Sequence, residues 1–362
     1  MKVLYDSTTF SSQVFGGISH YFVELMNHLP HNWQYDLTVK ASENEYLPLL
    51  RPRPRVLSLR HVPEHKKLYN FINRFADRAA LKADAFDIFH PTDYRDYFFR
   101  YLKRPYVITV HDMQFLDYVD RGIFSPEYGE VIKRVILNAR GIIAISNTTR
   151  ENLLNSLDVN PDRVSVVYHG FQAEPIVSTR ARWLPSKYIL YVGQRSDYKN
   201  FSTFFEAFKR MAHKDPDLNL VCTGKPFTPA EKDTIARAGL MSRVHHRLVR
   251  QHDMHMLYAH AACFVFPSRM EGFGMPVLEA YAAGCPVALS NASCLPEIGG
   301  NGALYFHPGD PDQMVRTITA LVYDPSVNIP IRQEARRRLR QFSWEKCGRE
   351  TAQVYEKTLG SL

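Results

Sequence analysis

No stretch of the sequence approaches the roughly 18 consecutive apolar residues that a membrane-spanning helix needs. The N-terminus contains only the short apolar run Val3–Tyr5, far below the core of about 7–15 residues in a signal peptide. We interpret this run as a first strand rather than as a targeting segment. A chain without either feature is expected to stay in the cytoplasm.

Cysteine is scarce as well, and acidic residues are outnumbered. The five cysteines are an odd number without any CxxC spacing, which favours buried free thiols in a reducing compartment over a disulfide framework. The 45 Lys and Arg residues against 37 Asp and Glu give a formal charge of +8, which favours anionic partners. The charge alone does not choose among phosphates, nucleic acid and a membrane surface.

The length and the residue pattern predict an α/β protein of two domains. At 362 residues the chain fits two domains of about 150–200 residues each. Short runs rich in valine, isoleucine and aromatic residues alternate with longer helical stretches, and this alternation predicts parallel sheets covered on both faces. The expected strands are Lys2–Tyr5, Asp87–His90, Tyr106–Val110, Gly141–Ile145, Val164–Val167, Tyr188–Val192, Leu218–Thr223, Ala262–Phe266, Pro286–Leu289 and Ala303–Phe306.

The segment from Gly170 to Pro185 has two prolines and no clear period, and it is predicted to link the domains. We place the domains at residues 1–172 and 173–343, followed by a final helix at about 344–362. Ligands of open α/β sheets collect at the carboxyl ends of the strands. Two such domains facing each other would form a cleft lined by the loops that follow the strands.

A basic loop follows the expected strand Tyr188–Val192. Gly193 ends the strand, and Arg195 and Lys199 come before the next helix. Arginine offers a planar fork of donors and lysine a compact charge, which suits a diphosphate. A solvated basic loop is the alternative interpretation.

The most informative motif follows the buried strand that ends at Phe266. A helix is expected from Pro276 to Ala283, because proline at the first helical position is a helix start signal. Amides at a helix start bind anions, and glycines let the backbone approach a ligand closely. The residues of this start are Gly272, Phe273, Gly274, Met275 and Pro276.

Two carboxylates flank this helix start, Glu271 before it and Glu279 expected in its first turn. A carboxylate repels phosphate, so both are expected to accept hydrogen bonds from the hydroxyls of a sugar or a ribose. The alternatives are a favourable charge near the helix start for Glu279 and a structural role for Glu271. A dinucleotide fingerprint fits poorly, because Val277 replaces its third glycine and no acidic residue ends the next strand.

In the first half, Gly16 and Gly17 follow the first strand and open a helix, where their amides would lie over the same diphosphate. A tight turn is the alternative. The strand Tyr106–Val110 ends in His111 and Asp112, a polar pair at the edge of the sheet where ligands bind. The next strand end, at Ser146, is interpreted as a helix cap.

These motifs together resemble the retaining glycosyltransferases of family 4, in particular bacterial mannosyltransferases of group 1. The resemblance covers nearly the whole chain. It is carried by Gly16-Gly17-Ile18 with Tyr21, His111-Asp112, Ile145-Ser146, Tyr168-His169-Gly170, Val192-Gly193 with Lys199-Asn200, the pair Glu271 and Glu279 spaced eight apart, and residues 290–308. The glutamate pair with its internal Gly-Phe-Gly-x-Pro is highly specific, whereas Gly16-Gly17 alone would be weak.

The resemblance implies the GT-B fold, in which two Rossmann-like domains face each other and the last helix crosses back to the N-terminal domain. It implies that Arg195 and Lys199 bind the donor diphosphate, that Gly17 approaches the phosphates, and that His111 lies near the reaction centre. The alignment of Arg195 is less secure than that of Lys199, because the length of this loop varies in the family.

The same resemblance assigns residues to the sugar, the ribose and the base of the donor. Glu271 would bind the hydroxyls of the transferred sugar and Glu279 the ribose, while Leu248 and Arg250 would border the base pocket. A nucleotide-diphosphate sugar is then the substrate, with GDP-mannose favoured slightly over a UDP-sugar. The acceptor would be a glycan, often lipid-linked in this family and used in surface polysaccharides such as O-antigen.

No cofactor or metal is expected. Asp215-Pro216-Asp217 and Asp310-Pro311-Asp312 are interpreted as proline turns at helix boundaries. The histidines from His245 to His260 lack the spacing of a zinc site. Fixed positive charge and helix-start amides would instead stabilise the leaving diphosphate.

Two stretches, His61–Arg74 and Tyr94–Arg104, mix basic and aromatic residues and would suit a membrane interface. A solvated edge with its aromatics in the core is the alternative. A nucleic-acid binder is disfavoured, since the basic run Arg336–Arg340 belongs to no recognised module. A nucleotide-sugar epimerase, a phosphorylase with pyridoxal, and a non-catalytic nucleotide-sugar binder are the remaining alternatives. The sequence leaves the oligomeric state open.

Overall fold

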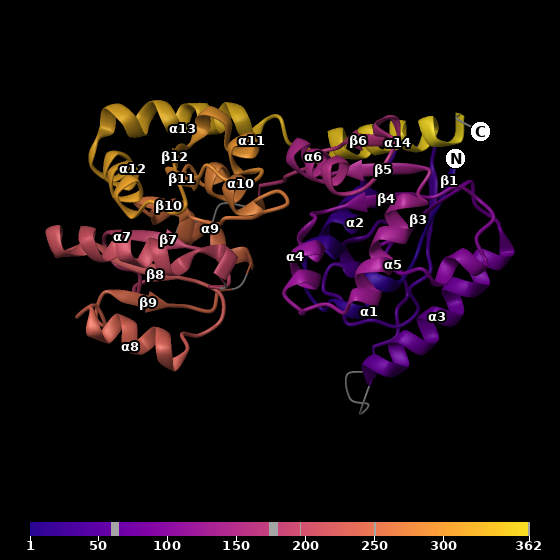
Figure 1. Ribbon diagram of the computed structural model, residues 1–362, viewed down its shortest axis with the longest axis horizontal. Helices are drawn as coiled ribbons and strands as arrows, with labels where there is room; N and C mark the ends of the chain where they lie inside the picture. The colour runs from indigo at the N-terminus through magenta and orange to yellow at the C-terminus, as the bar shows by residue number, and fades with distance from the viewer. Residues whose placement is uncertain (59–64, 174–179, 196, 250, 361–362) are drawn as a thin grey trace. The chain divides into compact units, whose positions relative to one another are not determined.

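The computed structural model describes residues 1–58, 65–173, 180–195, 197–249 and 251–360. The chain divides into two compact units (Figure 1). The N-terminal unit consists of Met1–Gly170 together with Ser343–Leu362, and the C-terminal unit consists of Phe171–Phe342. The boundaries predicted after residues 172 and 343 fall close to this division.

The N-terminal unit contains two three-stranded parallel sheets, ordered β2-β1-β3 and β4-β5-β6. An isolated parallel bridge between Phe89 and Tyr106 links their neighbouring edges. The strands are β1 (Lys2–Tyr5), β2 (Gln34–Leu37), β3 (Ile88–His90), β4 (Val107–Val110), β5 (Gly141–Ala144) and β6 (Val164–Val166). The helices are α1 (Thr8–Ser12), α2 (Gly17–Asn27), α3 (His65–Ala83), α4 (Gln114–Asp120), α5 (Pro126–Leu137), α6 (Asn147–Ser156) and α14 (Trp344–Gly360), with short 3-10 turns at Leu47–Leu49, Tyr97–Arg100 and Pro161–Arg163.

Both faces of these sheets are covered, because successive strand residues join different cores. Val3 and Tyr5 pack into a core with α2 and α14. Leu4 packs into a second core together with residues of α5. In β5, Ile143 belongs to the first core and Ile142 to the second. This alternation follows from the period of two in a strand and confirms the predicted doubly covered parallel architecture.

The C-terminal unit is built on one six-stranded parallel sheet in the order β12-β11-β10-β7-β8-β9. Its strands are β7 (Tyr188–Tyr191), β8 (Asn219–Cys222), β9 (Val244–His246), β10 (Cys263–Phe266), β11 (Val287–Ser290) and β12 (Leu304–Phe306). Its helices are α7 (Phe201–Lys214), α8 (Pro229–Arg237), α9 (Gln251–His260), α10 (Met275–Ala282), α11 (Leu295–Gly299), α12 (Pro311–Tyr323) and α13 (Pro325–Leu339), with 3-10 turns at Asp197–Lys199 and Gly300–Gly302.

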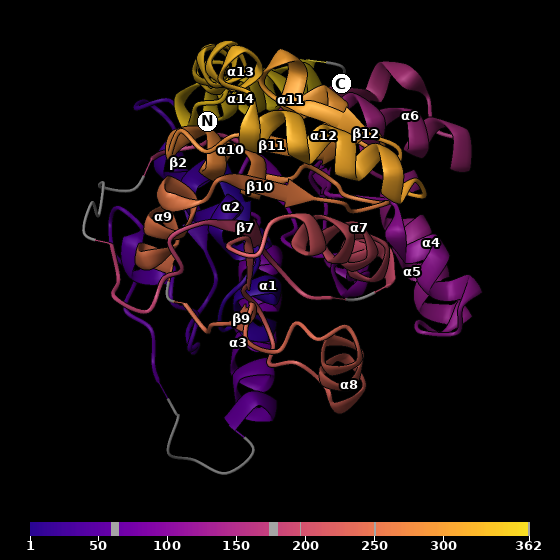
Figure 2. The same ribbon diagram turned by 90° about the vertical axis from the view of Figure 1, so that its left-hand side faces the viewer.

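Helices cover both faces of this sheet as well. Figure 2 shows α7 and α12 on one side and α9 and α10 on the other. Cys263 and Val265 of β10 pack into the core with α7 and α12. Phe264 points to the opposite face, where its ring lies 5.2 Å from that of Tyr258 on α9.

The strand order reverses between β7 and β10, which are neighbours in the sheet. From β7 the chain proceeds outward through β8 and β9, and from β10 it proceeds outward on the other side. In open α/β sheets such a switch point, at the carboxyl ends of the strands, is where ligands bind. The loops that follow β7 and β10 therefore define where a site is expected.

The last helix, α14, packs onto the N-terminal unit, as the family resemblance implied. The hydroxyl of Tyr355 is hydrogen-bonded to that of Tyr5 at 2.9 Å and lies 2.6 Å from Nδ1 of His90. At Gly348, an added Cβ would lie 2.0 Å from the carbonyl oxygen of His28, so only glycine permits this close approach.

The sequence missed the two edge strands β2 and β9. β2 is half exposed, with the burial pattern of an edge rather than of a core strand, and β9 carries two histidines in three residues. The linker prediction covers residues 174–179, which lie outside the described residues. All five cysteines are buried free thiols, as predicted. Among the described residues, no helix combines the length and apolar character required to cross a bilayer.

Candidate active site

An ion pair joins the two loops at the switch point of the C-terminal unit. The ammonium of Lys199, which follows β7, lies 2.6 Å from Oε1 of Glu271, which follows β10. The two side chains are 17% and 12% exposed, so they are screened from water but still accessible. The structure thus brings together two of the residues that the sequence singled out separately.

Asn200 holds these loops together. Its amide nitrogen donates to the carbonyl oxygens of Pro267, after β10, and Pro308, after β12. Asn200 is 2% exposed and adopts the left-handed conformation with φ of 57°. Asparagine tolerates this conformation better than most residues, which explains its place directly after Lys199.

The backbone of Glu271 is fixed by the loop after β11. The Ser293 hydroxyl accepts a hydrogen bond from the Glu271 amide at 3.2 Å and donates one to the Glu271 carbonyl at 2.7 Å. Ser293 has a φ of 55°, a strained conformation for a serine. No separate signal in the sequence points to Ser293, although it lies within the 290–308 stretch of the family resemblance.

The helix start after Glu271 differs by one position from the prediction. Gly274 is the N-cap, with a φ of 95°, and α10 begins at Met275, so Pro276 is the second helical residue. The left-handed conformation explains the need for glycine at position 274. Glu279 is then the fifth residue of α10 and not in its first turn, which weakens the interpretation of this carboxylate as a simple charge at the helix start.

Glu279 is instead held by a buried tyrosine. The hydroxyl of Tyr258 on α9 donates to Oε2 of Glu279 at 2.9 Å. Tyr258 is fully buried, and its burial raises the pKa of the phenol well above the usual value, so it stays a donor. Sequence reasoning missed Tyr258, because a tyrosine in a helix facing a strand looks like ordinary core.

Arg195, the other basic residue of this loop, is paired within the C-terminal unit. Its guanidinium donates to Oε1 of Glu231 at 2.7 Å, and its side chain is 4% exposed. Each of its three nitrogens has an acceptor in the C-terminal unit; the carbonyl acceptors are those of Thr223, Lys225 and Pro226. Its predicted role as a diphosphate ligand beside Lys199 stays a prediction. Arg195 anchors the loop after β8 and the start of α8.

The physical reason lies in Glu231, which forms a capping box with Thr228 at the start of α8. A partly buried carboxylate there needs a cation, and Arg195 can reach it while its guanidinium stacks 4.6 Å from the ring of Phe227. The sequence pattern showed the basic residue and not this competing acceptor.

Gly193 keeps a conformation that leaves space beside the strand end. Its φ is 116°, and an added Cβ would meet nothing within 4 Å. Its amide donates to Oγ1 of Thr223 at 3.3 Å. Of the residues predicted to border a base pocket, Leu248 is 76% exposed, and Arg250 lies outside the described residues.

In the N-terminal unit, His111 follows β4 at the carboxyl edge of the sheet. Its ring packs edge-on against Tyr21 at 5.2 Å and His169 at 5.7 Å. Burial lowers the pKa of His111 to about 4, so the imidazole is neutral at physiological pH. A neutral imidazole can donate one hydrogen bond without bringing a charge.

The glycine pair opens α2 as predicted. An added Cβ at Gly16 would lie 2.4 Å from Oε1 of Gln13, whereas at Gly17 it would meet nothing within 4 Å. The Gln13 oxygen accepts a hydrogen bond from the Ser19 amide at 3.2 Å. Gly17 thus borders open space at a helix start, as a ligand-facing residue requires.

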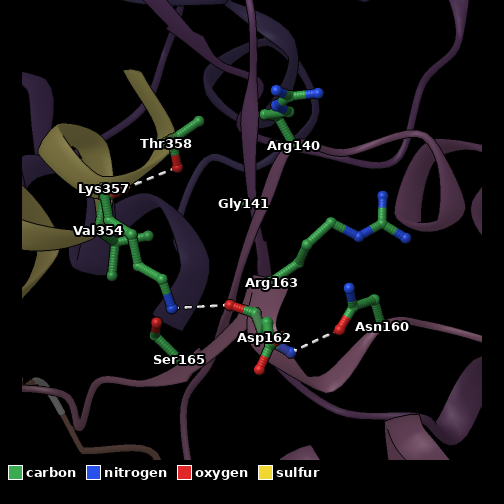
Figure 3. Close-up of a pocket in the computed structure, with 9 residues that line it drawn as sticks. All are labelled: Arg140, Gly141, Asn160, Asp162, Arg163, Ser165, Val354, Lys357 and Thr358. Atoms are coloured by element: carbon green, nitrogen blue, oxygen red, sulfur yellow. Dashed lines mark hydrogen bonds between the residues drawn. The ribbon is translucent and has the colours of Figure 1, made fainter. Parts of the chain in front are cut away.

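One pocket lies at the opposite edge of the N-terminal sheet. It is lined by α14 and by residues just before and within the first part of β5 and β6, including Arg140, Arg163 and Lys357 (Figure 3). Lys357 donates to the carbonyl oxygen of Asp162 at 2.7 Å, which ties α14 to the unit. Because it lies at the amino ends of the strands, this pocket is separate from the edge that carries His111.

The Asp-Pro-Asp motifs have structural partners. Asp215 pairs with Lys187 at 2.6 Å, and Asp310 caps α12. Nε2 of His245 lies 3.0 Å from Oδ1 of Asn219, and Nε2 of His246 lies 2.7 Å from the carbonyl oxygen of Gly224.

Comparisons with known proteins show which family the chain resembles. Residues 15–174 match the family described as Glycosyltransferase Family 4, and residues 180–342 match Glycosyl transferases group 1. The O-antigen chain mannosyltransferase B of Escherichia coli is 27% identical over 323 residues, which cover 78% of this chain and 82% of that protein. The O-antigen chain mannosyltransferase RfbU of Salmonella typhimurium is 27% identical over 210 residues, which cover 58% of each chain.

A solved structure shares the fold. Anabaena HepE in complex with UDP-glucose superposes with a TM-score of 0.73 at 18% identity, and the alignment covers 100% of both chains. The two family matches together span nearly the whole sequence and join at the boundary between the two units. The chain therefore belongs to the group 1, family 4 glycosyltransferases and has their GT-B fold of two Rossmann-like domains.

Proposed function

We propose that the protein is a retaining glycosyltransferase that moves a mannosyl group from GDP-mannose to a glycan acceptor during synthesis of a bacterial surface polysaccharide. The observation that carries the proposal is the Lys199–Glu271 ion pair at the switch point of the C-terminal sheet. The names of the two mannosyltransferase relatives support the sugar and the pathway class. The donor is a substrate, and neither a metal nor a cofactor is required by the proposal.

Lys199 is proposed to stabilise the charge that develops on the diphosphate as the sugar–phosphate bond breaks. In the unliganded protein this ammonium is neutralised by Glu271. A diphosphate is the stronger partner for the ammonium, so donor binding would exchange one anion for another. The exchange releases the Glu271 carboxylate, which then accepts hydrogen bonds from hydroxyls of the sugar.

Glu279 is proposed to bind the ribose hydroxyls. Its carboxylate is oriented by the hydrogen bond that the Tyr258 hydroxyl donates at 2.9 Å. His111 is proposed to donate a hydrogen bond to the sugar as a neutral imidazole, since burial lowers its pKa to about 4. In a retaining reaction of this kind the leaving phosphate accepts the proton of the acceptor hydroxyl, so His111 need not act as the base.

A thermal-shift screen against GDP-, UDP-, ADP- and dTDP-sugars tests the donor. A ligand that binds the folded state raises the melting temperature in proportion to the logarithm of its concentration above the dissociation constant. We expect the largest shift with GDP-mannose. A larger shift with UDP-glucose, the ligand of the HepE structure, would transfer the proposal to a UDP-sugar. No shift with any of them would contradict the proposal.

Product analysis separates the remaining activities. Transfer releases GDP in proportion to an α-linked product when the acceptor is present, and the rate is unchanged by EDTA. An epimerase would return a changed sugar on the nucleotide without an acceptor. A non-catalytic binder would bind the donor and never release GDP.

A further inference from the structure

Helix α3 (His65–Ala83) carries an exposed aromatic pair on its outer face. Phe71 is 73% exposed and Phe75 is 74% exposed, more than any other phenylalanine among the described residues. The two rings are four residues apart and therefore lie on the same side of the helix. The helix lies at the periphery of the N-terminal unit (Figure 1).

The surroundings of these rings are basic. Phe71 and Phe75 line a shallow depression along α3 whose other walls are Lys67, Asn70, Arg74 and Arg78. Neither Arg74 nor Arg78 forms an ion pair with a described residue. The depression thus combines two aromatic rings with cationic side chains and no carboxylate.

The only acidic residue of α3 faces inward. Asp77 is 2% exposed and accepts hydrogen bonds from the Ser7 amide at 3.1 Å and the Ser7 hydroxyl at 2.9 Å. On the same inner face, Asn73 accepts from the amides of Lys40 and Ala41 at 2.8 and 3.0 Å. These contacts set the rotation of α3, so the exposure of Phe71 and Phe75 is a fixed property of the helix.

We propose that the outer face of α3 docks onto an anionic lipid bilayer, with Phe71 and Phe75 in the interface and Arg74 and Arg78 on lipid phosphates. An amphipathic helix with aromatic residues between cations matches the chemistry of such a surface. An exposed apolar patch on a globular unit marks an interaction site. The inference names the membrane-binding element and does not depend on which donor or acceptor the enzyme uses.

A second copy of the chain is a poorer occupant. In a two-fold contact the same face meets itself, which would bring Arg74 and Arg78 of each copy near those of the other without an intervening carboxylate on this helix. The other basic-aromatic stretch, Tyr94–Arg104, does not offer a comparable patch. Phe98 is fully buried there, and Phe99 is 37% exposed.

Co-sedimentation of the full chain with vesicles tests the proposal. We expect binding to phosphatidylglycerol–phosphatidylcholine vesicles and much weaker binding to pure phosphatidylcholine. The double variant Phe71→Ser/Phe75→Ser should lower the partition coefficient roughly tenfold or more. Arg74→Gln/Arg78→Gln should lower it by a similar factor, and added salt should weaken the wild type but not this variant to the same degree.

Control variants change exposed residues of the C-terminal unit. Met241→Ser/Ile329→Ser removes two side chains that are each 55% exposed. Arg336→Gln/Arg340→Gln removes the same charge as the α3 double variant. Vesicle binding that falls equally in the controls and in the α3 variants would overturn the proposal, because binding would then depend on the overall charge or surface hydrophobicity of the protein.

A site-specific label gives a second measurement. All five native cysteines are buried, so Phe75→Cys can be labelled selectively with a polarity-sensitive fluorophore. Its emission should shift to the blue on anionic vesicles, while a label at Ile329→Cys should not. An unchanged label at position 75 would overturn the proposal, as would a dimer that the Phe71→Ser/Phe75→Ser variant abolishes. Unaltered transfer to a water-soluble acceptor in that variant keeps this test separate from the enzymatic one.

Discussion

At the scale of single residues, the charged groups of the candidate site are paired with other side chains of the protein, and we expect a ligand to replace some of these partners. Glu271 illustrates this most clearly, because its backbone is held by Ser293 while its side chain neutralises Lys199. The backbone contacts hold Glu271 in place in the loop that follows β10, next to the loop that follows β7. The side-chain contact is the part that a diphosphate is expected to replace.

Lys199→Ala should lower turnover by about 10²–10³-fold, because it removes the fixed positive charge that stabilises the negative charge developing on the diphosphate. The fold should survive, because the partly buried Lys199 side chain lies in a loop and belongs to no hydrophobic core. Steady-state kinetics and circular dichroism test both parts. Lys209→Ala, which removes a lysine paired with Glu206 on α7, is the matched control. Normal turnover in Lys199→Ala would exclude this role.

His111 makes a prediction about pH and stability. Its pKa is lowered by burial from 6.5 to about 4, so the folded state resists protonation more than the unfolded chain does. Stability from this group is fully present above about pH 6.5 and is lost as the pH falls toward 4, by on the order of 3 kcal/mol. Urea unfolding of His111→Asn should show a shallower decline than the wild type over this range.

The same depressed pKa predicts that His111 contributes no ionisation to the rate profile between about pH 5 and 8. Two identical stability curves for His111→Asn and the wild type would contradict the lowered pKa. A break near neutral pH in the rate that disappears in His111→Asn would show instead that the imidazole titrates during catalysis.

At the scale of elements, Arg195 connects a strand end to a helix. Arg195→Ala would leave the Glu231 carboxylate without its cation and three carbonyl groups without their donor. Breaking a buried ion pair in this way costs about 3 kcal/mol or more. We expect a clearly lower melting temperature, measured by calorimetry. The dissociation constant of the donor should change only through displacement of the loop that Arg195 holds.

Lys199→Ala is the natural comparison for Arg195→Ala. The two variants should show opposite profiles, with lost turnover and intact stability for the former and lost stability for the latter. An Arg195→Ala protein with full stability and weakened donor binding would instead support the diphosphate role that the sequence pattern predicted.

The sequence predicted the elements better than the contacts of individual side chains. Buried strands such as Cys263–Phe266 are continuous apolar runs, and Gly274 and Pro276 punctuate the following helix, so both signals are local. The edge strand β2 has no such run and was missed. The direction taken by Arg195 depends on Glu231, 36 residues later in the chain, and no local pattern reports a partner at that separation.

The candidate site shows the same division. The ion pair of Lys199 with Glu271 was anticipated as two separate ligand-binding residues, because each follows a buried strand. Tyr258 was not anticipated, since its role depends on the register of α9 against α10. A hydrophobic pattern contains no information on the partner of a tyrosine hydroxyl, and only the fold shows that this hydroxyl donates to a carboxylate.

At the scale of the whole molecule, the two units are distinct in the chain but not consecutive in it, because α14 returns to the N-terminal unit. Twenty residues at the C-terminus, Ser343–Leu362, thus belong to the same compact unit as the first strand. The hydroxyls of Tyr5 and Tyr355, 350 residues apart, are hydrogen-bonded to each other. We expect the stability of the N-terminal unit to depend on this helix and that of the C-terminal unit to be independent of it.

Gly348→Ala tests this organisation. The added Cβ would lie 2.0 Å from the carbonyl oxygen of His28, so α14 must shift away from α2. Overpacking of this kind should lower the melting temperature of the N-terminal unit by roughly 5 °C. Gly360→Ala, on the same helix with nothing within 4 Å of the new Cβ, is the control and should leave the transition in place.

Calorimetry in the presence of GDP should resolve a second transition, raised by the nucleotide and unmoved by Gly348→Ala, because Lys199, Glu271 and Glu279 all belong to the C-terminal unit. If both transitions fall together in Gly348→Ala, the two units unfold as one cooperative body and α14 stabilises the whole chain.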